Sequence, residues 1–341
     1  MAEKLLDVQG LQVQFATEDG IVRAVDDVSF ALERGKVLGI VGESGSGKSV
    51  TSMTILGLTR DVNTKFEGSV LYKGQDLLAM SESELRRFRG NEIAMIFQDP
   101  MTAMNPVYRV GDQIVEAILT HEDVGKSNAR KRAIQLLRQV GIPHPDERID
   151  DYPHQFSGGM RQRAMIAMAL ANNPEILIAD EPTTALDVTI QAQIIELIDR
   201  LKDDFNSSVI LITHDLGVVA DVADDIAVMY AGRIVEYGTK RQIFYDPQHP
   251  YTWGLLGSIP RLDREKPDRL TSIAGSPPSL INLPQGCKFR PRCPHAFAKC
   301  TEQPPLENRV DDEPPHLDRC WLSLDEKRDL REATISGQAA A

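Results

Sequence analysis

The chain is short of positive charge, of long hydrophobic runs and, over most of its length, of cysteine. Its 38 Lys and Arg stand against 50 Asp and Glu, a net charge of −12, which argues against nucleic acid as a partner because broad phosphate binding needs a basic surface. The longest strongly apolar runs, such as residues 164–171, fall far below the ~18–20 residues that cross a bilayer. The N-terminal sequence MAEKLLDVQGLQ has acidic residues and no apolar stretch with a cleavage site, unlike a secretory signal. These absences predict a cytoplasmic protein that does not span a membrane.

Cysteine is absent from the first 286 residues, and all four cysteines fall between Cys287 and Cys320. In a reducing compartment this clustering favours a local metal site over disulfide bonds. The remaining composition, 42% hydrophobic and 26% charged over 341 residues, is that of a globular protein with two domains or with one large domain and an appendage.

Strand and helix signals alternate over residues 1–258, which indicates an α/β layered fold. We expect these residues to form one domain. Continuously apolar segments are typical of parallel strands buried on both faces. They occupy residues 37–41, 93–97, 176–179, 209–213 and 226–230. Residues 11–15 and 25–32 alternate between apolar and polar, which predicts an antiparallel portion beside the parallel core.

Three stretches depart from this alternation. Between Pro100 and Pro153 helical patterning dominates, which predicts a helical subdomain inserted at about residues 100–165, with its run of Lys and Arg facing solvent. After residue 258 prolines crowd a segment with little periodicity, so we expect a small loop-rich C-terminal module over residues 259–324. The polar and then alanine-rich residues 325–341 are expected to form a disordered tail.

A glycine-rich stretch follows the strand at residues 37–41 and precedes an apolar segment, residues 50–58, for which we expect a helix. It fits the phosphate-loop pattern G-x-x-x-x-G-K-S with Gly42, Glu43, Ser44, Gly45, Ser46, Gly47, Lys48 and Ser49. Backbone N–H groups and the helix N-terminus would surround the phosphates, Lys48 would reach the β- and γ-phosphates, and the Ser49 hydroxyl would bind Mg²⁺. The alternative is a Gly/Ser-rich surface loop that fits by chance, and the flanking strand and helix disfavour it.

The apolar run at residues 176–179 ends in two adjacent carboxylates, Asp180 and Glu181. Because neighbours on a strand point in different directions, Asp180 can face Mg²⁺ while Glu181 faces the water that attacks the γ-phosphate. An acidic strand end that caps the following turn is the alternative. If the two carboxylates were considered alone, this capping role would be a plausible alternative, but the presence of the phosphate loop favours the catalytic interpretation.

The sequence FSGGMRQR at residues 156–163 lies between these two elements. With all three in this order, the chain resembles the ATP-binding cassette family over about its first 260 residues. The resemblance implies an ATPase whose mixed sheet has a parallel core and an antiparallel portion. It also implies a site completed only in a dimer, where Ser157, Gly158 and Gly159 grip the γ-phosphate of ATP held by the opposite subunit. On the residues alone, the start of an ordinary glycine-containing helix is the alternative.

The same resemblance implies roles for four further residues. Gln98 corresponds to a glutamine that contacts Mg²⁺ or the attacking water and whose loop senses a transmembrane partner. His214 corresponds to the switch histidine at the γ-phosphate, Asp187 to a dimer contact, and Phe15 to the aromatic ring that stacks on adenine. Without the resemblance, Gln98 would carry no signal, His214 would be interpreted as a core histidine, and Phe15 as a half-buried strand aromatic.

The segments DPQHPYTWGLLGSIP (246–260) and GCKFRPRCPHAFAKC (286–300) resemble the C-terminal extension of peptide and nickel importer ATPases. Met160 and the sequence FQDPMTAMNPV (97–107) resemble the first of the two ATPase subunits in such systems. The resemblance implies a peripheral ATPase on the inner face of the plasma membrane that powers uptake of di- or oligopeptides. Its partners would be a second, non-identical cassette ATPase, two transmembrane permease subunits and an extracytoplasmic solute-binding protein. The alternatives are an importer ATPase for nickel or another small solute, and a soluble redox-sensing regulatory or repair ATPase.

The cysteines follow the spacing C-x₅-C-x₆-C-x₁₉-C, with Cys287, Cys293, Cys300 and Cys320. Four thiolates can hold a [4Fe–4S] cluster or a tetrahedral Zn²⁺. The lack of a C-x₂-C pair weakens a zinc ribbon, and the resembling importer ATPases carry an iron–sulfur cluster in this segment. We therefore favour the cluster over Zn²⁺, with free structural thiols as a third alternative. Lys, Arg or Pro beside three of the cysteines would suit an anionic cluster.

Overall fold

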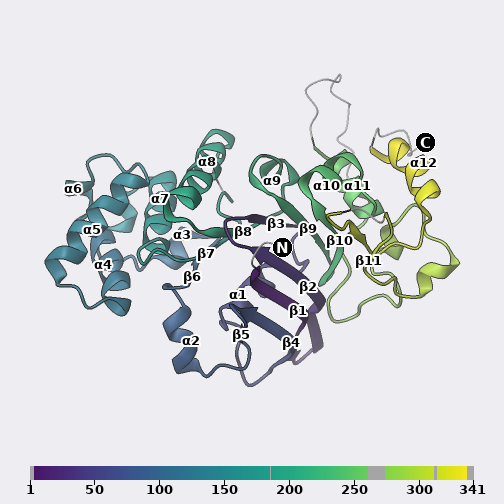
Figure 1. Ribbon diagram of the computed structural model, residues 1–341, viewed down its shortest axis with the longest axis horizontal. Helices are drawn as coiled ribbons and strands as arrows, with labels where there is room; N and C mark the ends of the chain where they lie inside the picture. The colour runs from purple at the N-terminus through teal and green to yellow at the C-terminus, as the bar shows by residue number, and fades with distance from the viewer. Residues whose placement is uncertain (1–3, 185, 260–272, 311–312, 336–341) are drawn as a thin grey trace. The chain divides into compact units, whose positions relative to one another are not determined.

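The computed structural model describes residues 4–184, 186–259, 273–310 and 313–335, and the chain divides into two compact units (Figure 1). Unit 1 comprises residues 1–5, 32–37 and 79–212, and unit 2 comprises residues 6–31, 38–78 and 213–341. Both units are assembled from segments far apart in the sequence, so long-range packing defines each of them.

Unit 1 contains three parallel strands, paired in the order β6-β7-β8. Their bounds are β6 (Ile93–Ile96), β7 (Ile176–Asp180) and β8 (Ser208–Thr213). Nearly every side chain in them is apolar, and all of their residues are buried, as expected for a parallel sheet covered on both faces. The carboxyl ends of parallel strands share one edge of a sheet, so Gln98 and the Asp180-Glu181 pair follow strands that end at the same edge.

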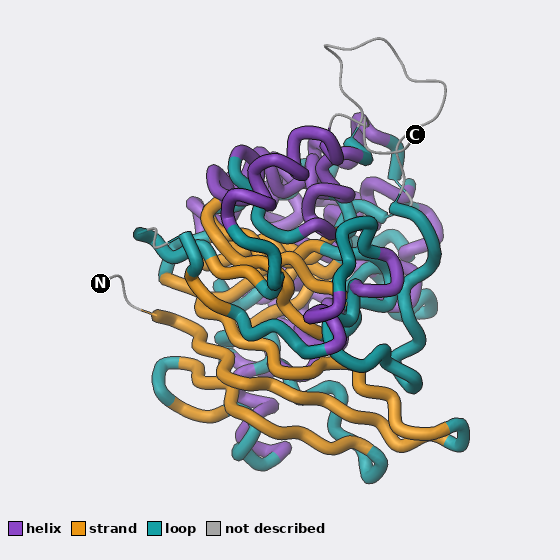
Figure 2. Tube along the Cα trace, turned by 90° about the vertical axis from the view of Figure 1, so that its right-hand side faces the viewer, coloured by secondary structure: helices purple, strands orange, loops and turns teal. Residues whose placement is uncertain are grey.

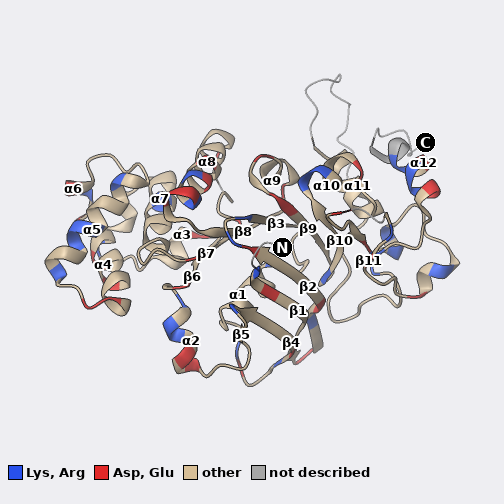
Figure 3. Ribbon diagram, viewed as in Figure 1, with Lys and Arg blue, Asp and Glu red and all other residues tan. Residues whose placement is uncertain are grey.

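The other named elements within residues 79–207 of unit 1 are helices. They are α2 (Glu82–Phe88), α3 (Pro100–Ala103), α4 (Val110–His121), α5 (Lys126–Gln139), α6 (Pro145–Arg148), the 3-10 helix η1 (Pro153–Gln155), α7 (Gly158–Ala169) and α8 (Val188–Phe205). Helices α3 to η1 occupy the stretch in which helical patterning predicts an inserted subdomain. The basic face of α5 is paired with acidic residues: Arg130 lies 2.7 Å from Asp150 and Arg132 lies 2.6 Å from Glu122. Charges of both signs are interspersed over these helices (Figure 3).

Unit 2 contains two sets of paired strands, drawn in orange in Figure 2. One is antiparallel, in the order β2-β1-β4-β5, with β1 (Lys4–Thr17), β2 (Gly20–Glu33), β4 (Thr64–Tyr72) and β5 (Gln75–Asp76). In the other, β3 pairs with β9 in parallel, and β9-β10-β12-β11 are antiparallel. Its strands are β3 (Val37–Val41), β9 (Asp225–Tyr230), β10 (Arg233–Thr239), β11 (Glu307–Asn308) and β12 (Leu317–Asp318). All five predicted parallel strands are present, and the antiparallel portion lies where alternation predicts it.

The helices of unit 2 are short apart from the last. They are α1 (Lys48–Ile55), α9 (Leu216–Val222), α10 (Lys240–Tyr245), α11 (Pro250–Gly257), the 3-10 helices η2 (Arg290–Arg292) and η3 (Ala298–Thr301), and α12 (Leu324–Ile335). Within the described ranges, no helix has both the length and the apolar character needed to cross a bilayer.

Helix α12 differs from the expectation of a disordered tail from residue 325 onward. Residues 325–335 are helical because the helix is held by tertiary contacts. Lys327 is buried and lies 2.7 Å from the equally buried Asp318, and Leu330 packs against Trp253, Cys320 and Leu322. Residues 336–341 of the predicted tail lie outside the described residues.

Candidate functional site

The phosphate-loop residues 42–49 connect β3 to α1 in unit 2, with strand and helix placed as the motif requires. Gly47 is the N-cap of α1 and has φ 98°, a conformation open to glycine at little cost. A Cβ on Gly47 would overlap the carbonyl oxygen of Ala24, and one on Gly42 would overlap that of Met229. The loop can therefore take this shape only with glycine at both positions.

Polar groups of the loop are arranged to receive an anion. Lys48 is buried, and its Nζ donates to the carbonyl oxygens of Gly42 at 2.6 Å and Glu43 at 3.1 Å. The Ser46 hydroxyl is buried and has no hydrogen-bond partner in the described part of the chain. A buried hydroxyl without a partner is costly, and a phosphate oxygen on the N-terminal side of α1 would satisfy it. These residues fit a nucleotide phosphate.

The carboxyl edge of the unit 1 strands brings Gln98 and Glu181 together. Gln98 Nε2 donates to Glu181 Oε2 at 3.1 Å, and the Thr184 hydroxyl donates to the same oxygen at 2.9 Å. Glu181 has φ 45°, a left-handed conformation uncommon for a residue with a side chain and often found at functional sites. Asp180, by contrast, ends β7 with its side chain buried. The two neighbouring carboxylates thus occupy different environments, and the left-handed backbone at Glu181, just after the last strand residue Asp180, contributes to the difference.

The predicted signature residues stand at the N-terminus of α7. Ser157 is its N-cap, and the Ser157 hydroxyl accepts the backbone N–H of Met160 at 3.3 Å. Ser157 and Gly158 are exposed, while the buried Phe156 fixes the preceding turn. The exposed N-terminal turn can offer backbone N–H groups to an anion from outside the chain.

Asp187, His214 and Phe15 are three further predicted site residues. Asp187 is the exposed N-cap of α8 and accepts the Ile190 backbone N–H at 3.0 Å. His214 follows β8 and is exposed, not buried as a core histidine would be. Phe15 lies on β1 opposite Thr64 and is half-buried. Unit 2 holds His214, Phe15 and the phosphate loop, and unit 1 holds the other predicted nucleotide-site residues.

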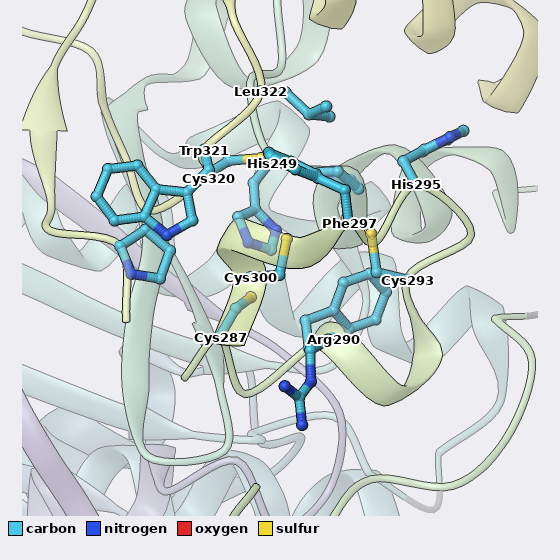
Figure 4. A pocket seen from close by; sticks show the side chains of 13 residues that line it. His249, Cys287, Arg290, Cys293, His295, Phe297, Cys300, Cys320, Trp321 and Leu322 are labelled. Atoms are coloured by element: carbon cyan, nitrogen blue, oxygen red, sulfur yellow. The ribbon is translucent and has the colours of Figure 1, made fainter. Parts of the chain in front are cut away.

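All four cysteines line one cavity of unit 2 (Figure 4). They belong to residues 286–322, here called the cysteine module, whose described residues form η2, η3, β11, β12 and connecting loops. The largely apolar lining of the cavity includes Phe289, Phe297, Trp321 and Leu322. The Cys287 backbone N–H donates to the Cys300 carbonyl oxygen at 3.0 Å, which ties the two halves of the module together.

Burial disfavours the thiolate form of three of these cysteines. It raises the pKa of Cys287, and it raises the pKa of Cys293 and of Cys320 to about 12. Thiolates would need a bound cationic group to stay charged there. Among the described residues, no three His, Cys, Asp or Glu side chains lie close enough together to hold a single metal ion.

Three basic residues near the cysteines contact acidic residues of the preceding sequence instead of the cavity. Lys288 lies 2.5 Å from Asp26, Arg319 lies 2.7 Å from Asp27, and Arg292 lies 2.6 Å from Glu43. These pairs attach the cysteine module to the rest of unit 2. Arg290 lines the cavity, together with His249 and His295.

Sequence reasoning missed Arg292 and Tyr251 as neighbours of the phosphate loop. The Tyr251 hydroxyl accepts the Glu43 backbone N–H at 2.9 Å. Hydrogen bonds to Glu43 and Tyr230 hold the pKa of Arg292 above its usual value, although burial alone would lower it. Both residues lie in the two segments that set the C-terminal region apart in the sequence, but no local pattern connects them with Glu43.

Two family profiles match the chain. The profile of the ABC transporter family covers residues 25–184, and that of the oligopeptide/dipeptide transporter C-terminal region covers residues 235–300. Among curated proteins, the dipeptide transport ATP-binding protein DppD of Bacillus subtilis is 54% identical over 338 residues, 99% of each chain. The oligopeptide transport ATP-binding protein OppD of Salmonella typhimurium is 51% identical, covering 95% of this chain and 96% of its own.

Solved structures agree on the fold. The ATP-binding cassette MJ0796, in a dimeric post-hydrolysis state bound to ADP and Pi, matches with a TM-score of 0.62 and 26% identity, covering 69% of this chain and 99% of that one. The cassette cbiO1 of Clostridium perfringens matches with a TM-score of 0.60 and 26% identity, covering 72% of this chain and 92% of that one. The predicted cassette fold is confirmed.

Proposed function

The chain belongs to the ABC transporter family, and we propose that it is the ATP-hydrolysing subunit of an importer that takes up dipeptides or oligopeptides. The family membership makes it an ATPase. The peptide cargo is supported by the oligopeptide/dipeptide C-terminal region at residues 235–300 and by near full-length relatives named for peptide transport. We assign residues 1–258 to the nucleotide-binding domain and residues 259–324 to the extension.

In this proposal the phosphate loop holds the ATP phosphates. Loop N–H groups and the N-terminus of α1 face the anion, and Lys48 leaves the carbonyl oxygens of Gly42 and Glu43 to contact the β- and γ-phosphates. Phe15 stacks on the adenine. Mg²⁺, bound together with ATP, neutralises phosphate charge, and Ser49, Asp180 and Gln98 are the residues that would hold it.

Glu181 is the proposed general base. Its Oε2 already accepts hydrogen bonds from Gln98 and Thr184, so the carboxylate is held in one orientation and can position the attacking water. His214 would hydrogen-bond the γ-phosphate. The assignment of Glu181 as general base rests mainly on its contact with Gln98, because this hydrogen bond brings together two predicted site residues that are 83 positions apart.

The test is the substitution Glu181→Gln. We expect ATP binding to persist while the turnover number falls at least about 100-fold, the usual contribution of a general base. Glu196→Gln changes an exposed glutamate of α8 in the same unit and should leave turnover unchanged. Wild-type turnover in Glu181→Gln would refute the catalytic assignment.

Exposed groups of unit 1 support two kinds of protein partner. The segment after β6 exposes four large apolar side chains, Phe97 (39%), Met101 (47%), Val107 (72%) and Tyr108 (57%). Such exposure marks interaction surfaces, and we assign it to the transmembrane permease subunits. Ser157, Gly158 and Asp187 are exposed as well. This exposure suits contact with a second, non-identical cassette subunit and with the ATP that it holds.

These partners place the protein at the cytoplasmic face of the plasma membrane as a peripheral subunit. Co-purification of the tagged chain from detergent-solubilised membranes should recover two polytopic proteins, a second cassette ATPase and a solute-binding protein. Uptake assays with peptides and with Ni²⁺ on the same strain then separate a peptide importer from a nickel importer. Recovery of the tagged chain only from the soluble fraction, without membrane proteins, would refute the importer assignment. A regulatory or repair ATPase would then be the remaining interpretation.

For the cysteine module we propose a [4Fe–4S] cluster held by Cys287, Cys293, Cys300 and Cys320. The support is their position around one cavity with a largely apolar lining and the burial that disfavours free thiolates there. A cluster distributes the four sulfurs over several iron atoms, whereas Zn²⁺ would draw all four to about 2.3 Å from one point.

Metal analysis of anaerobically purified protein tests this assignment. We expect about four iron and four sulfide per chain and loss of iron in Cys320→Ser. Stoichiometric zinc without sulfide would support the tetrahedral alternative. Folded protein that contains neither iron nor zinc would refute both metal assignments and indicate that the four cysteines are structural thiols.

A further inference from the structure

The phosphate loop is held by residues of the C-terminal region through its second residue, Glu43. Arg292 Nη1 donates to Glu43 Oε2 at 2.6 Å, and Arg292 Nη2 donates to Glu43 Oε1 at 3.0 Å, a bidentate pair of the strongest kind between side chains. The Tyr251 hydroxyl accepts the Glu43 backbone N–H at 2.9 Å. Both the side chain and the backbone of Glu43 are thus fixed by residues more than 200 positions away.

Arg292 is itself held in a single orientation. Its side chain is 4% exposed. Its Nε donates to the Ala274 carbonyl oxygen at 3.0 Å, its Nη2 donates also to the Ile273 carbonyl oxygen at 3.3 Å, and its guanidinium lies 5.7 Å from the centre of the Tyr230 ring. A buried planar guanidinium with all these partners has little freedom left to lose, so it can hold Glu43 at one position.

We propose that Arg292 is a positioning residue for the phosphate loop and that, through it, the cysteine module sets the affinity of the protein for ATP. The inference rests on the nucleotide site of the proposed function and is independent of the cargo. It adds to that function a role for a residue outside the nucleotide motifs.

Two physical effects would act together. Arg292 neutralises the Glu43 carboxylate, which would otherwise repel phosphates bound in the same loop. It also fixes the Glu43 backbone, whose carbonyl oxygen accepts Lys48 Nζ at 3.1 Å, so that the lysine starts from a defined position. Both effects change the binding of ATP rather than the hydrolytic step, so they should alter KM and Kd more than kcat.

The test measures ATP binding by the full chain, and KM and kcat for ATP in its assembled transporter complex. For Arg292→Gln we expect KM and Kd to rise about 10-fold with kcat within about 2-fold of wild type. Arg292→Lys keeps the charge but loses the bidentate geometry, so it should recover part of the affinity. Iron content and unfolding temperature are measured in parallel to confirm that the module remains intact.

Arg319→Gln is the matched control. Arg319 is also buried and also attaches the module to the rest of unit 2, through Asp27 at 2.7 Å. Its side-chain hydrogen-bond partners among the described residues, Asp27, Ile234 and Pro304, lie outside the phosphate loop. We expect a change of less than about 2-fold in KM. An equal rise in KM for Arg319→Gln and Arg292→Gln would overturn the proposal, because loosening the module would then suffice.

A second variant tests the electrostatic effect by removing the carboxylate that Arg292→Gln leaves unpaired. Glu43→Gln combined with Arg292→Gln should bind ATP more tightly than Arg292→Gln, and a double variant impaired as severely as the single one would contradict the electrostatic part. Unchanged affinity in a folded Arg292→Gln would overturn the inference and leave the proposed function standing. A wild-type chain that neither binds nor hydrolyses ATP would overturn both.

Discussion

The phosphate loop and the cysteine module are built by opposite means, although both lie in unit 2. The loop takes its shape from backbone: glycine at positions 42 and 47 admits neighbouring carbonyl groups, and Lys48 bonds to carbonyl oxygens of the loop itself. The described residues of the module have two short 3-10 helices and two two-residue strands, and side-chain pairs such as Lys288–Asp26 attach it.

This contrast indicates how each region responds to substitution. Substitutions in the loop should weaken ligand binding more than they destabilise the fold, since its glycines set the backbone geometry around the phosphate. A module held by buried charges should lose stability first, since removal of one partner leaves the other buried and unpaired. The following substitutions test the contrast from both sides.

The largest effect is expected for Gly47→Ala. The added Cβ would overlap the Ala24 carbonyl oxygen at a residue with φ 98°, so the loop must change shape. A cost of about 3 kcal/mol corresponds to a loss of roughly 100-fold in ATP affinity, measured by titration calorimetry, with little change in the unfolding temperature. Gly45→Ala is the matched control, because Gly45 also has positive φ (78°) but has no neighbour within 4 Å of its added Cβ. Equal affinity losses in the two variants would refute the steric explanation.

The elements that carry the predicted nucleotide-site residues were predictable because their sequence signals are local. The apolar run that forms β7 ends at Asp180, Ser157 begins α7 as an N-cap, and the phosphate loop lies between a strand and a helix. Each feature is a pattern within about ten residues. The contact between Gln98 and Glu181 was not predicted; it arises because both residues follow parallel strands, whose carboxyl ends share one edge.

The C-terminal region was less predictable because its contacts are long-range and polar. Helix α12 has low apolar content, and the pair of Lys327 with Asp318 that holds it has no signal in the local sequence. Likewise, the basic residues beside the cysteines suggested a positive setting for the cavity, yet Lys288 and Arg292 contact Asp26 and Glu43. Basic residues that are close to the cysteines in the sequence therefore do not necessarily face the cysteine cavity in the fold.

Lys327→Met should cost stability rather than activity. The Asp318 side chain is fully buried, burial already raises its pKa, and without Lys327 its negative charge would lose its close partner. We expect a loss of about 3 kcal/mol in the free energy of unfolding, measured by denaturant titration of the full chain. Arg328→Met, one position along the same helix with a side chain 67% exposed, should change it by less than about 0.5 kcal/mol. Similar losses in both variants would indicate that helix propensity, not the buried pair, holds α12.

A smaller and pH-dependent effect is expected for Asp26→Asn. Although burial alone would raise it, hydrogen bonds from Arg233 and Lys288 lower the pKa of Asp26 from 3.8 to about 2. The unfolded state therefore binds more protons than the folded state between these values, and the stability that the carboxylate contributes is present above pH 4 and disappears as the pH falls toward 2. The difference in unfolding free energy between wild type and Asp26→Asn should be about 2 kcal/mol at pH 7 and shrink toward zero near pH 2. A difference independent of pH would show that Asp26 acts through packing and that the module is not attached by this charge.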